Sequence, residues 1–415
     1  MKNPFRKNSA FTIVELLITI AIVIILASSV VLYLNPVERL AEGRDSRRTN
    51  ELNQISAALR LVYNQGKIKG NSQVVYLSLP DSSATCGSYS LPQLPSGWSY
   101  ACTPSATYLN VDGTGWIPVN FNVIPGGSTL SFIPADPRNT QDFYYAYVTN
   151  PTDHTFVVTS LLESEKHMKL AAAKDNGYDD GRYEAGSNLS LWAGASGLVG
   201  YWPLSEGRGT TTADVSGNGY AGTLINSPAW VSGAQGFGIN SLFSATSGAA
   251  SYVKTAAIPA TKGILKNGYE TSKWSLSVWA KQTASNGNED IILGKQGCNG
   301  GIYTWNSGYA FAIKSTSCWT GAQTVAYKPS DMTTWHHLVA TYDSGYMSFY
   351  VDGARVGTAT YVYATYPINA YSDYFGIGAS EGGSYGFNGY VDEAKIYNRV
   401  LSPTEVLEAY KALKQ

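Results

Sequence analysis

The stretch FTIVELLITI, residues 11–20, opens an apolar run that continues to Leu34. The run covers 24 residues (11–34), close to the roughly 20 that a helix needs to cross the hydrocarbon core of a bilayer. Its one charged residue is Glu15. A charge at the bilayer centre is opposed by roughly 2.5–3.5 kcal/mol on insertion scales and is usually functional. The run therefore predicts a helix that spans a membrane over residues 11–34.

A short basic leader precedes this run. It carries Lys2, Arg6 and Lys7 and ends in Ser9-Ala10. Cationic residues next to a membrane helix stay on the cytoplasmic side, so the chain after the helix is expected outside. This arrangement predicts a single-pass protein of the cytoplasmic membrane with its C-terminal part outside the cell.

The leader and the apolar run together resemble the class III signal and N-terminal helix of type IV prepilins and pseudopilins. The resemblance implies a leader over residues 1–10, removed by a prepilin peptidase between Ala10 and Phe11, and methylation of the new N-terminus. The family usually has glycine before the cut, where this chain has Ala10. Glu15 would neutralise the free amine of Phe11 on a neighbouring pilin-like subunit, which favours assembly into a surface filament or pseudopilus. An uncleaved anchor and a secretory signal cut near Ala27 remain as alternatives.

The composition is that of an exported chain. Charged residues make up 14%, against roughly 25% in an average domain, and there are 30 tyrosines and 42 glycines. The formal net charge of -1 argues against bulk electrostatic binding of nucleic acid, so no nucleic-acid partner is expected. The four cysteines form two close pairs, and the local pairing is favoured among the three possible ones. The expected disulfides are Cys86–Cys102 and Cys298–Cys318.

The helix is expected to continue over residues 11–65, with a kink at Pro36. Leu52, Ile55, Leu59 and Val62 recur at helical spacing and would face a folded head.

Residues 66–192 read as this small β-rich, pilin-like head. The runs 143–148 and 155–160 predict a hairpin. Asp175, Asp179 and Asp180 lie around glycines, a pattern that can bind calcium, although a plain acidic turn is favoured.

Residues 193–196 are a candidate linker of small residues, and 197–415 form the last domain. The segments 274–279, 335–342 and 389–402 carry alternating apolar residues separated by turns, as in a β-sandwich. They resemble the laminin-G-like jelly roll of the concanavalin A-like superfamily. The expected fold class is therefore α+β: a long N-terminal membrane or filament helix, a small β-rich head and an all-β jelly-roll sandwich.

Two candidate sites lie in the jelly roll. The resemblance implies a structural calcium ion near Asp214 and Asp392, although an acidic residue common in the family is replaced here, at residues 242–244. A second set of side chains is aromatic and lies between the cysteines of the second pair or just beyond them, where stacking on sugar rings or protein contacts is expected. Its members are Tyr303, Trp305, Tyr309 and Trp319. Packing into the core is the competing interpretation.

Catalysis is not expected. Retaining glycosidases of this superfamily carry an E-x-D-x-x-E strand, and the sequence lacks this pattern. His336 and His337 are neighbours on an expected strand, where their side chains face opposite ways, so both are expected to be structural.

The sequence therefore favours a pilin-like subunit that displays a non-catalytic, lectin-like module for adhesion to, or capture of, a surface glycan or protein. The alternative is a minor pseudopilin of a type II-like secretion or DNA-uptake apparatus. A membrane-anchored glycoside hydrolase is less favoured.

Overall fold

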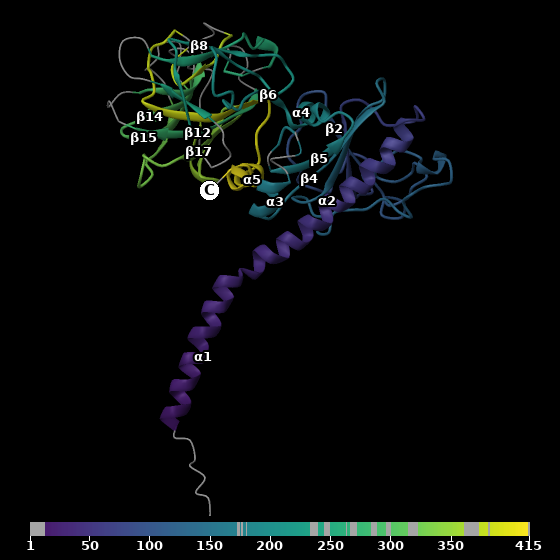
Figure 1. The fold of residues 1–415 in the computed structure, drawn as a ribbon. Coiled ribbons are helices and arrows are strands. Elements are labelled where there is room, and N and C mark those ends of the chain that lie inside the picture. The colour runs from purple at the N-terminus through teal and green to yellow at the C-terminus, as the bar shows by residue number, and fades with distance from the viewer. Residues whose placement is uncertain are drawn as a thin grey trace, which may run out of the picture.

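The computed structural model describes residues 13–171, 175, 177–179, 181–232, 240–244, 250–262, 264–265, 272–283, 289–295, 300–313, 323–360, 373–380 and 382–413. A long N-terminal helix leads into a small α/β head, and the jelly roll packs against one side of that head (Figure 1). The processing residues Ala10 and Phe11, together with Asp180, Cys298, Cys318 and Trp319, lie outside the described residues.

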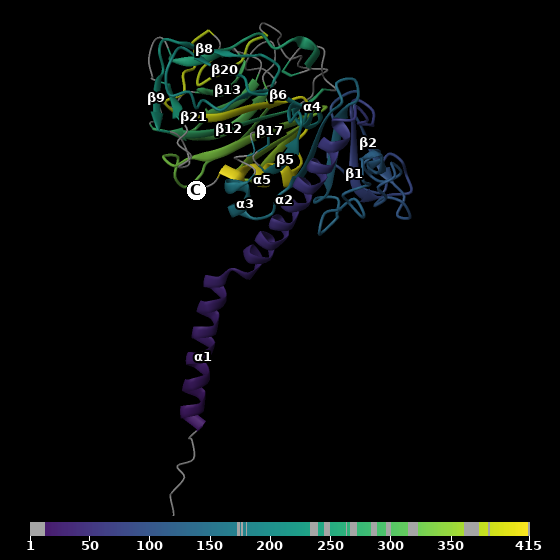
Figure 2. The ribbon, with the colours of Figure 1, turned by 45° about the vertical axis from the view of Figure 1, so that its right-hand side comes forward.

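The N-terminal helix is divided in two, as the position of Pro36 predicts. Helix α1 covers Ile13–Leu34 and α2 covers Pro36–Tyr63. Asn35 between them adopts a left-handed conformation with φ of 39°, and Pro36 opens α2, where its missing N–H has no intrahelical partner to lose. Helix α1 extends away from the rest of the chain (Figures 1 and 2). Within the described part of the chain, no helix is both long and apolar enough to cross a membrane.

Helix α2 packs on the head through the predicted face. Leu52, Ile55, Leu59 and Val62 are all fully buried and share one core with Trp116 and other aromatic residues of the head. Spacings of three and four residues place them on one side of the helix. The prediction of a helix face docked on the head is confirmed.

The head contains a sheet in the order β2-β1-β3-β4-β5. The predicted hairpin is confirmed as β3 and β4, in which Val148 pairs with Val157. The Cys86–Cys102 disulfide is also confirmed. The bounds of the strands and short helices of the head are β1 Val74–Pro80, β2 Ser99–Thr103, η1 Phe121–Val123, β3 Tyr145–Asn150, β4 Thr155–Leu161, α3 Glu165–Leu170, β5 Arg182–Gly186 and α4 Ser190–Ser196.

The last domain is the predicted all-β sandwich. Its head-facing sheet runs in the order β19-β18-β17-β12-β21-β10-β9, with β6 also paired to β21. Its distal sheet runs in the order β16-β15-β14-β13-β20-β11-β8-β7. Apolar side chains from both sheets fill the space between them, among them Trp202, Trp274 and Phe311. Helix α5 covers Pro403–Leu413.

The strands of the head-facing sheet are β6 Leu198–Trp202, β9 Ala229–Ser232, β10 Asn240–Ser244, β12 Lys273–Gln282, β17 His336–Asp343, β18 Tyr346–Val351, β19 Ala354–Thr360 and β21 Gly389–Tyr397. Those of the distal sheet, with one short helix, are β7 Thr211–Thr212, β8 Gly222–Ile225, β11 Tyr252–Thr255, η4 Ala260–Lys262, β13 Ile291–Lys295, β14 Gly300–Trp305, β15 Gly308–Ile313, β16 Gln323–Tyr327 and β20 Gly376–Ile377.

The residues expected as a linker, 193–196, do not form an exposed tether. They are the last turn of α4, and Ala193, Ala195 and Ser196 are buried. Gly197 then turns the chain with φ of 74°, and a Cβ there would lie 2.7 Å from Asn398 Oδ1. The small residues expected of a linker are instead required by close packing between the two domains.

Candidate functional site

Asp214, the first residue expected to bind calcium in the jelly roll, organises the opening turn of that domain. Its Oδ1 accepts hydrogen bonds from the backbone N–H groups of Tyr201 and Ser216, and its Oδ2 accepts one from Tyr220, at 2.8–3.0 Å. Asp392 is fully buried on β21, where its Oδ1 accepts a bond from the N–H of Glu393. Within the described residues, no group of three or more His, Cys, Asp or Glu side chains is arranged to hold a metal ion. Calcium at these residues stays a prediction.

The acidic turn of the head is also tied by backbone donors. Asp175 accepts hydrogen bonds from the N–H groups of Gly177 and Glu184, each at 2.6 Å, and Asp179 accepts one from Gly181. Burial raises the pKa of Asp179, while the charge of Arg182 opposes this shift. The described part of this segment is thus a hydrogen-bonded turn at the edge of the head.

Two of the four aromatic residues expected to bind a ligand, Tyr303 and Tyr309, are buried. Tyr309 has no exposed surface and belongs to the sandwich core, and Tyr303 is 2% exposed and packs with Ile291 and Ala312. Both rings therefore pack in the interior, which was the competing interpretation. Trp305, at the end of β14, is half-buried and keeps an accessible edge.

The histidine pair is structural, as its position on a strand predicts. The Nδ1 of His336 lies 2.7 Å from Asp352 Oδ2, and its Nε2 lies 2.6 Å from the carbonyl oxygen of Asp331. His337 stacks on Trp279, with ring centroids 5.2 Å apart. Burial lowers the pKa of His337 to about 3, so this ring is neutral at physiological pH.

A different aromatic cluster reaches the surface of the jelly roll. Trp335 and Tyr390 are half-buried, with ring centroids 6.3 Å apart, and Lys281 Nζ lies 5.8 Å from the Tyr390 ring. Lys281 and Tyr390 are paired residues of β12 and β21, and Trp335 directly precedes β17. We call these three residues the aromatic patch. Flat aromatic faces beside a cation are suited to stacking on a sugar ring or a planar group.

Polar groups border the aromatic patch. Asp331 and Thr333 are exposed in the loop before Trp335, and Thr283 bonds the amide group of Asn388 beside Tyr390. A small number of fixed polar groups around an apolar surface is typical of ligand sites. Both aromatic residues, Trp335 and Tyr390, are visible in the sequence, but only the pairing of the strands shows that their rings lie close together.

The two domains meet in a closely packed interface, which we call the seam. Leu162 and Met168 of the head pack with Trp279 and Leu413 of the jelly roll. Arg399 lies in the same interface and donates from Nε to the carbonyl oxygen of Ser196. These contacts fix the jelly roll, and with it the aromatic patch, in one orientation on the head.

Arg399 also forms a bidentate ion pair with Glu405. The two nitrogen–oxygen distances are 2.7 and 2.9 Å, and both side chains are largely buried. Burial acts to raise the pKa of Glu405, but the charge and hydrogen bonds of Arg399 outweigh it and lower the pKa to about 2. Glu405 is therefore ionised in the folded chain.

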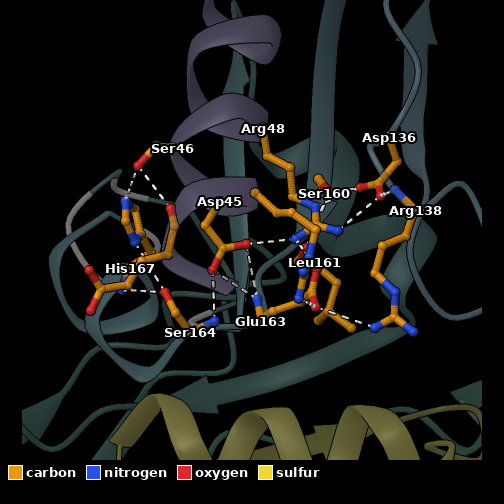
Figure 3. Close-up of polar contacts among 12 residues, drawn as sticks. Asp45, Ser46, Arg48, Asp136, Arg138, Ser160, Leu161, Glu163, Ser164 and His167 are labelled. Atoms are coloured by element: carbon orange, nitrogen blue, oxygen red, sulfur yellow. Dashed lines mark hydrogen bonds and ion pairs between the residues drawn. The ribbon is translucent and has the colours of Figure 1, made fainter. Parts of the chain in front are cut away.

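A cluster of charged residues within the head fixes α2 to it (Figure 3). Arg48 is fully buried and donates to both oxygens of Asp136, at 2.7 and 2.9 Å, and to Asp45 at 2.7 Å. Asp45 in turn accepts bonds from the N–H groups of Glu163 and Ser164, just before α3. A single arginine thus links α2, the loop at Asp136 and the start of α3, and α5 of the jelly roll packs next to α3.

Glu408 of α5 gives the seam a pH dependence. Burial raises its pKa to about 7 against the pull of Lys411, with further contributions from Asp45 and Glu163. The folded chain therefore holds this proton more tightly than an ordinary glutamate, whose pKa is 4.5. The stability that this contributes is complete below about pH 4.5 and is lost as the pH rises through about 7.

Glu408→Gln should therefore stabilise the chain at pH 8 by up to about 3 kcal/mol and change it little at pH 4. Urea unfolding of the detergent-solubilised chain at the two pH values measures this difference. Glu38→Gln, in the first turn of α2, is the matched control and should show no such difference. Equal effects of Glu408→Gln at both pH values would show that the carboxyl group does not titrate at the seam.

Comparison with known proteins places the last domain in a class. Residues 247–407 match the family model Laminin_G_3, described as the concanavalin A-like lectin/glucanases superfamily. The domain is therefore a laminin-G-like jelly roll of this superfamily, as the sequence motifs predict. No curated protein matches the chain.

Three solved structures illustrate the similarity. One is the binding domain of Paraclostridial Mosquitocidal Protein 1, with 16% identity, a TM-score of 0.39 and 52% of each chain covered. A second is a structure of botulinum neurotoxin type C, whose cell entry depends on interaction with two ganglioside molecules. It has 15% identity and a TM-score of 0.43, and the match covers 53% of this chain and 52% of that one. A third, domain 4 of the arabinanase AbnA from Geobacillus stearothermophilus with arabinotriose, has 17% identity, a TM-score of 0.38 and covers 51% of this chain and 98% of that one. The chain thus spans about half the length of the two toxin structures.

Proposed function

We propose that this chain is a helix-anchored, pilin-like subunit that displays a non-catalytic lectin-like jelly roll at the bacterial cell surface, for adhesion or capture of a glycan or protein. The observation that carries the proposal is the packing of the jelly roll on the head. The seam buries Leu162, Trp279 and the Arg399–Glu405 pair, so the module is held in a set orientation relative to the helix. A fixed orientation suits a subunit whose task is to present a binding surface.

The exposed surface of α1 supports the helix anchor. Apart from Glu15 and Thr19, its described side chains are apolar, and they are exposed, with Ile13 at 78% and Ile25 at 65%. An apolar surface of this extent requires a lipid or protein environment. We propose that a membrane covers α1 before assembly and that the helices of other pilin-like subunits cover it afterwards. In this proposal a prepilin peptidase cuts between Ala10 and Phe11, and Glu15 pairs with the free amine of a neighbouring subunit.

The position of the jelly roll favours a sparse or terminal place in such an assembly. The domain lies to one side of α2 rather than along its axis (Figures 1 and 2). A projecting domain of this size would crowd every position of a dense filament. The alternative function, a minor pseudopilin of a type II-like secretion or DNA-uptake apparatus, is supported by the same observation.

The aromatic patch is the proposed binding surface. Trp335→Ala and Tyr390→Ala should each weaken glycan or cell binding of the full detergent-solubilised chain at least tenfold, since each removes a stacking face. A glycan array and a cell-binding assay measure this loss. Both variants should melt at the wild-type temperature.

Trp305→Ala is the matched control, because Trp305 is also half-buried but lies on the distal sheet. It should bind as the wild type does. The reverse result, with binding lost in Trp305→Ala and kept in Trp335→Ala, would move the binding surface to the distal sheet and reject the aromatic patch.

A further inference from the structure

A cleft of about 200 Å³ lies between the head and the jelly roll, apart from the aromatic patch. One wall is formed by the head, from the loop at 90–92 and the segment at Gln141–Asp142. The other wall is the first turn of α5 and the residue before it, from Ser402 to Glu405. Tyr144, Leu161 and Arg182 complete the lining. The cleft therefore exists only where the two domains meet.

Arg182 is the buried cation of this cleft. It is 3% exposed, and among the residues that the structure describes its Nε and Nη1 atoms have no hydrogen-bond acceptor. The guanidinium lies 4.6 Å from the Trp192 ring and 5.7 Å from the Tyr144 ring. These two ring contacts offer no hydrogen-bond acceptor to the in-plane N–H donors of the guanidinium.

Two described carboxylates near Arg182 do not accept hydrogen bonds from these donors. Asp179 Oδ2 forms an ion pair with Arg182 Nε at 3.6 Å, a distance longer than a hydrogen bond. Both oxygens of Glu405 are bound by Arg399, and one also accepts from the N–H of Ser402. A buried donor without an acceptor is destabilising, so an additional acceptor in the cleft would be favoured.

A carboxylate is the acceptor that fits the edge of a guanidinium, since its two oxygens match two parallel N–H donors. The cleft is smaller than the roughly 300–1,000 Å³ of sites for drug-sized ligands, so it suits a molecule of about monosaccharide size. At the rim, Asp142 and Gln141 are exposed, and Ser90 and Thr404 add hydroxyl groups. A carboxylate such as Asp142 requires donors from the ligand, which sugar hydroxyl groups supply.

We propose that this cleft binds a sugar acid, a uronic acid in particular, with its carboxylate on the edge of Arg182 and its hydroxyl groups toward Asp142. This site is separate from the aromatic patch and goes beyond the proposed function. A ligand here contacts both domains, so its binding also stabilises the seam.

Titration calorimetry of the full detergent-solubilised chain with glucuronate, N-acetylglycine and glucose tests the proposal. Glucuronate should bind saturably, with a Kd of about 1 mM, and glucose should bind at least tenfold more weakly. N-acetylglycine carries the carboxylate of a peptide terminus without sugar hydroxyl groups, and it should also bind more weakly. Arg182→Lys, which keeps the charge and removes the planar fork, should weaken glucuronate binding at least tenfold.

Two variants test the cleft without touching Arg182. Thr404→Trp should fill the cleft and abolish glucuronate binding, whereas Leu407→Trp, on the exposed side of the same helix, should bind as wild type does. The proposal is overturned if glucose binds as tightly as glucuronate, if N-acetylglycine binds more tightly, or if a folded Thr404→Trp binds unchanged. Trp335→Ala should retain glucuronate binding, so a failure of the aromatic patch is distinguishable from a failure of this cleft.

Discussion

Replacing Arg48 with methionine should lower the free energy of unfolding of the head by about 3–5 kcal/mol. The substitution keeps much of the side-chain volume but removes the cation that pairs with Asp45, Asp136 and Glu163. Among the described residues, the cations left to pair with the three carboxylates would be the partly exposed Arg44 and Arg138, both on Glu163. Breaking a buried ionic network by removing one member is among the largest single effects on stability, because the remaining charges stay desolvated.

Urea unfolding followed by hydrogen exchange of α2 and α3 measures the effect of Arg48→Met. The matched control is Arg47→Met, whose ion pair with Glu51 lies on the surface, and it should change stability by less than about 1 kcal/mol. If the two variants are equally stable, the ionic cluster does not hold the helix to the head.

Acid should also weaken this ionic cluster, because protonation removes the charge of Glu163. Burial acts to raise the pKa of Glu163, but its bonds to Arg44 and the charge of Arg48 lower the pKa to about 2. A carboxyl group with a lowered pKa stabilises the folded chain above about pH 4.5, and this contribution is lost as the pH falls through about 2.

Glu405→Gln should lower the free energy that holds the two domains together by about 3–5 kcal/mol, because it leaves the largely buried Arg399 without its counter-charge. The jelly roll and the head should then melt in separate transitions, since the ion pair joins the start of α5 to the segment that contacts Ser196. Differential scanning calorimetry and limited proteolysis near Gly197 measure this separation.

Glu42→Gln is the control for the seam, because Glu42 pairs with Arg39 and Lys166 at the surface of the head. It should leave a single transition in place. One unchanged transition in Glu405→Gln would mean that apolar packing at Leu162, Trp279 and Leu413 is sufficient to join the domains.

Local sequence patterns predicted those parts of the fold that depend on near neighbours. The helix face of Leu52, Ile55, Leu59 and Val62 follows from a period of 3.6 residues, and the β3–β4 hairpin follows from two apolar runs around a turn. The disulfide between Cys86 and Cys102 joins residues 16 apart, close enough for spacing to indicate the pair.

The proposed binding surface could not be predicted in this way. Tyr303 and Tyr309 lie in strands whose sequence does not show which face of the sheet is covered. Only the assembled sandwich shows that both rings are buried. The aromatic patch joins Trp335 and Tyr390, which are distant in the chain and meet through the pairing of β12 with its two neighbours. The small residues of α4 looked like a linker because sequence alone does not distinguish a flexible connection from close packing.

The most direct test of the account is the N-terminal sequence and location of the chain in cells with an active prepilin peptidase. Surface filaments sheared from such cells are analysed by mass spectrometry for N-terminal and jelly-roll peptides. The account predicts chains that begin at Phe11, with jelly-roll peptides present at low stoichiometry in the filament fraction. Recovery of the chain only in the membrane fraction, beginning at Met1, would contradict it.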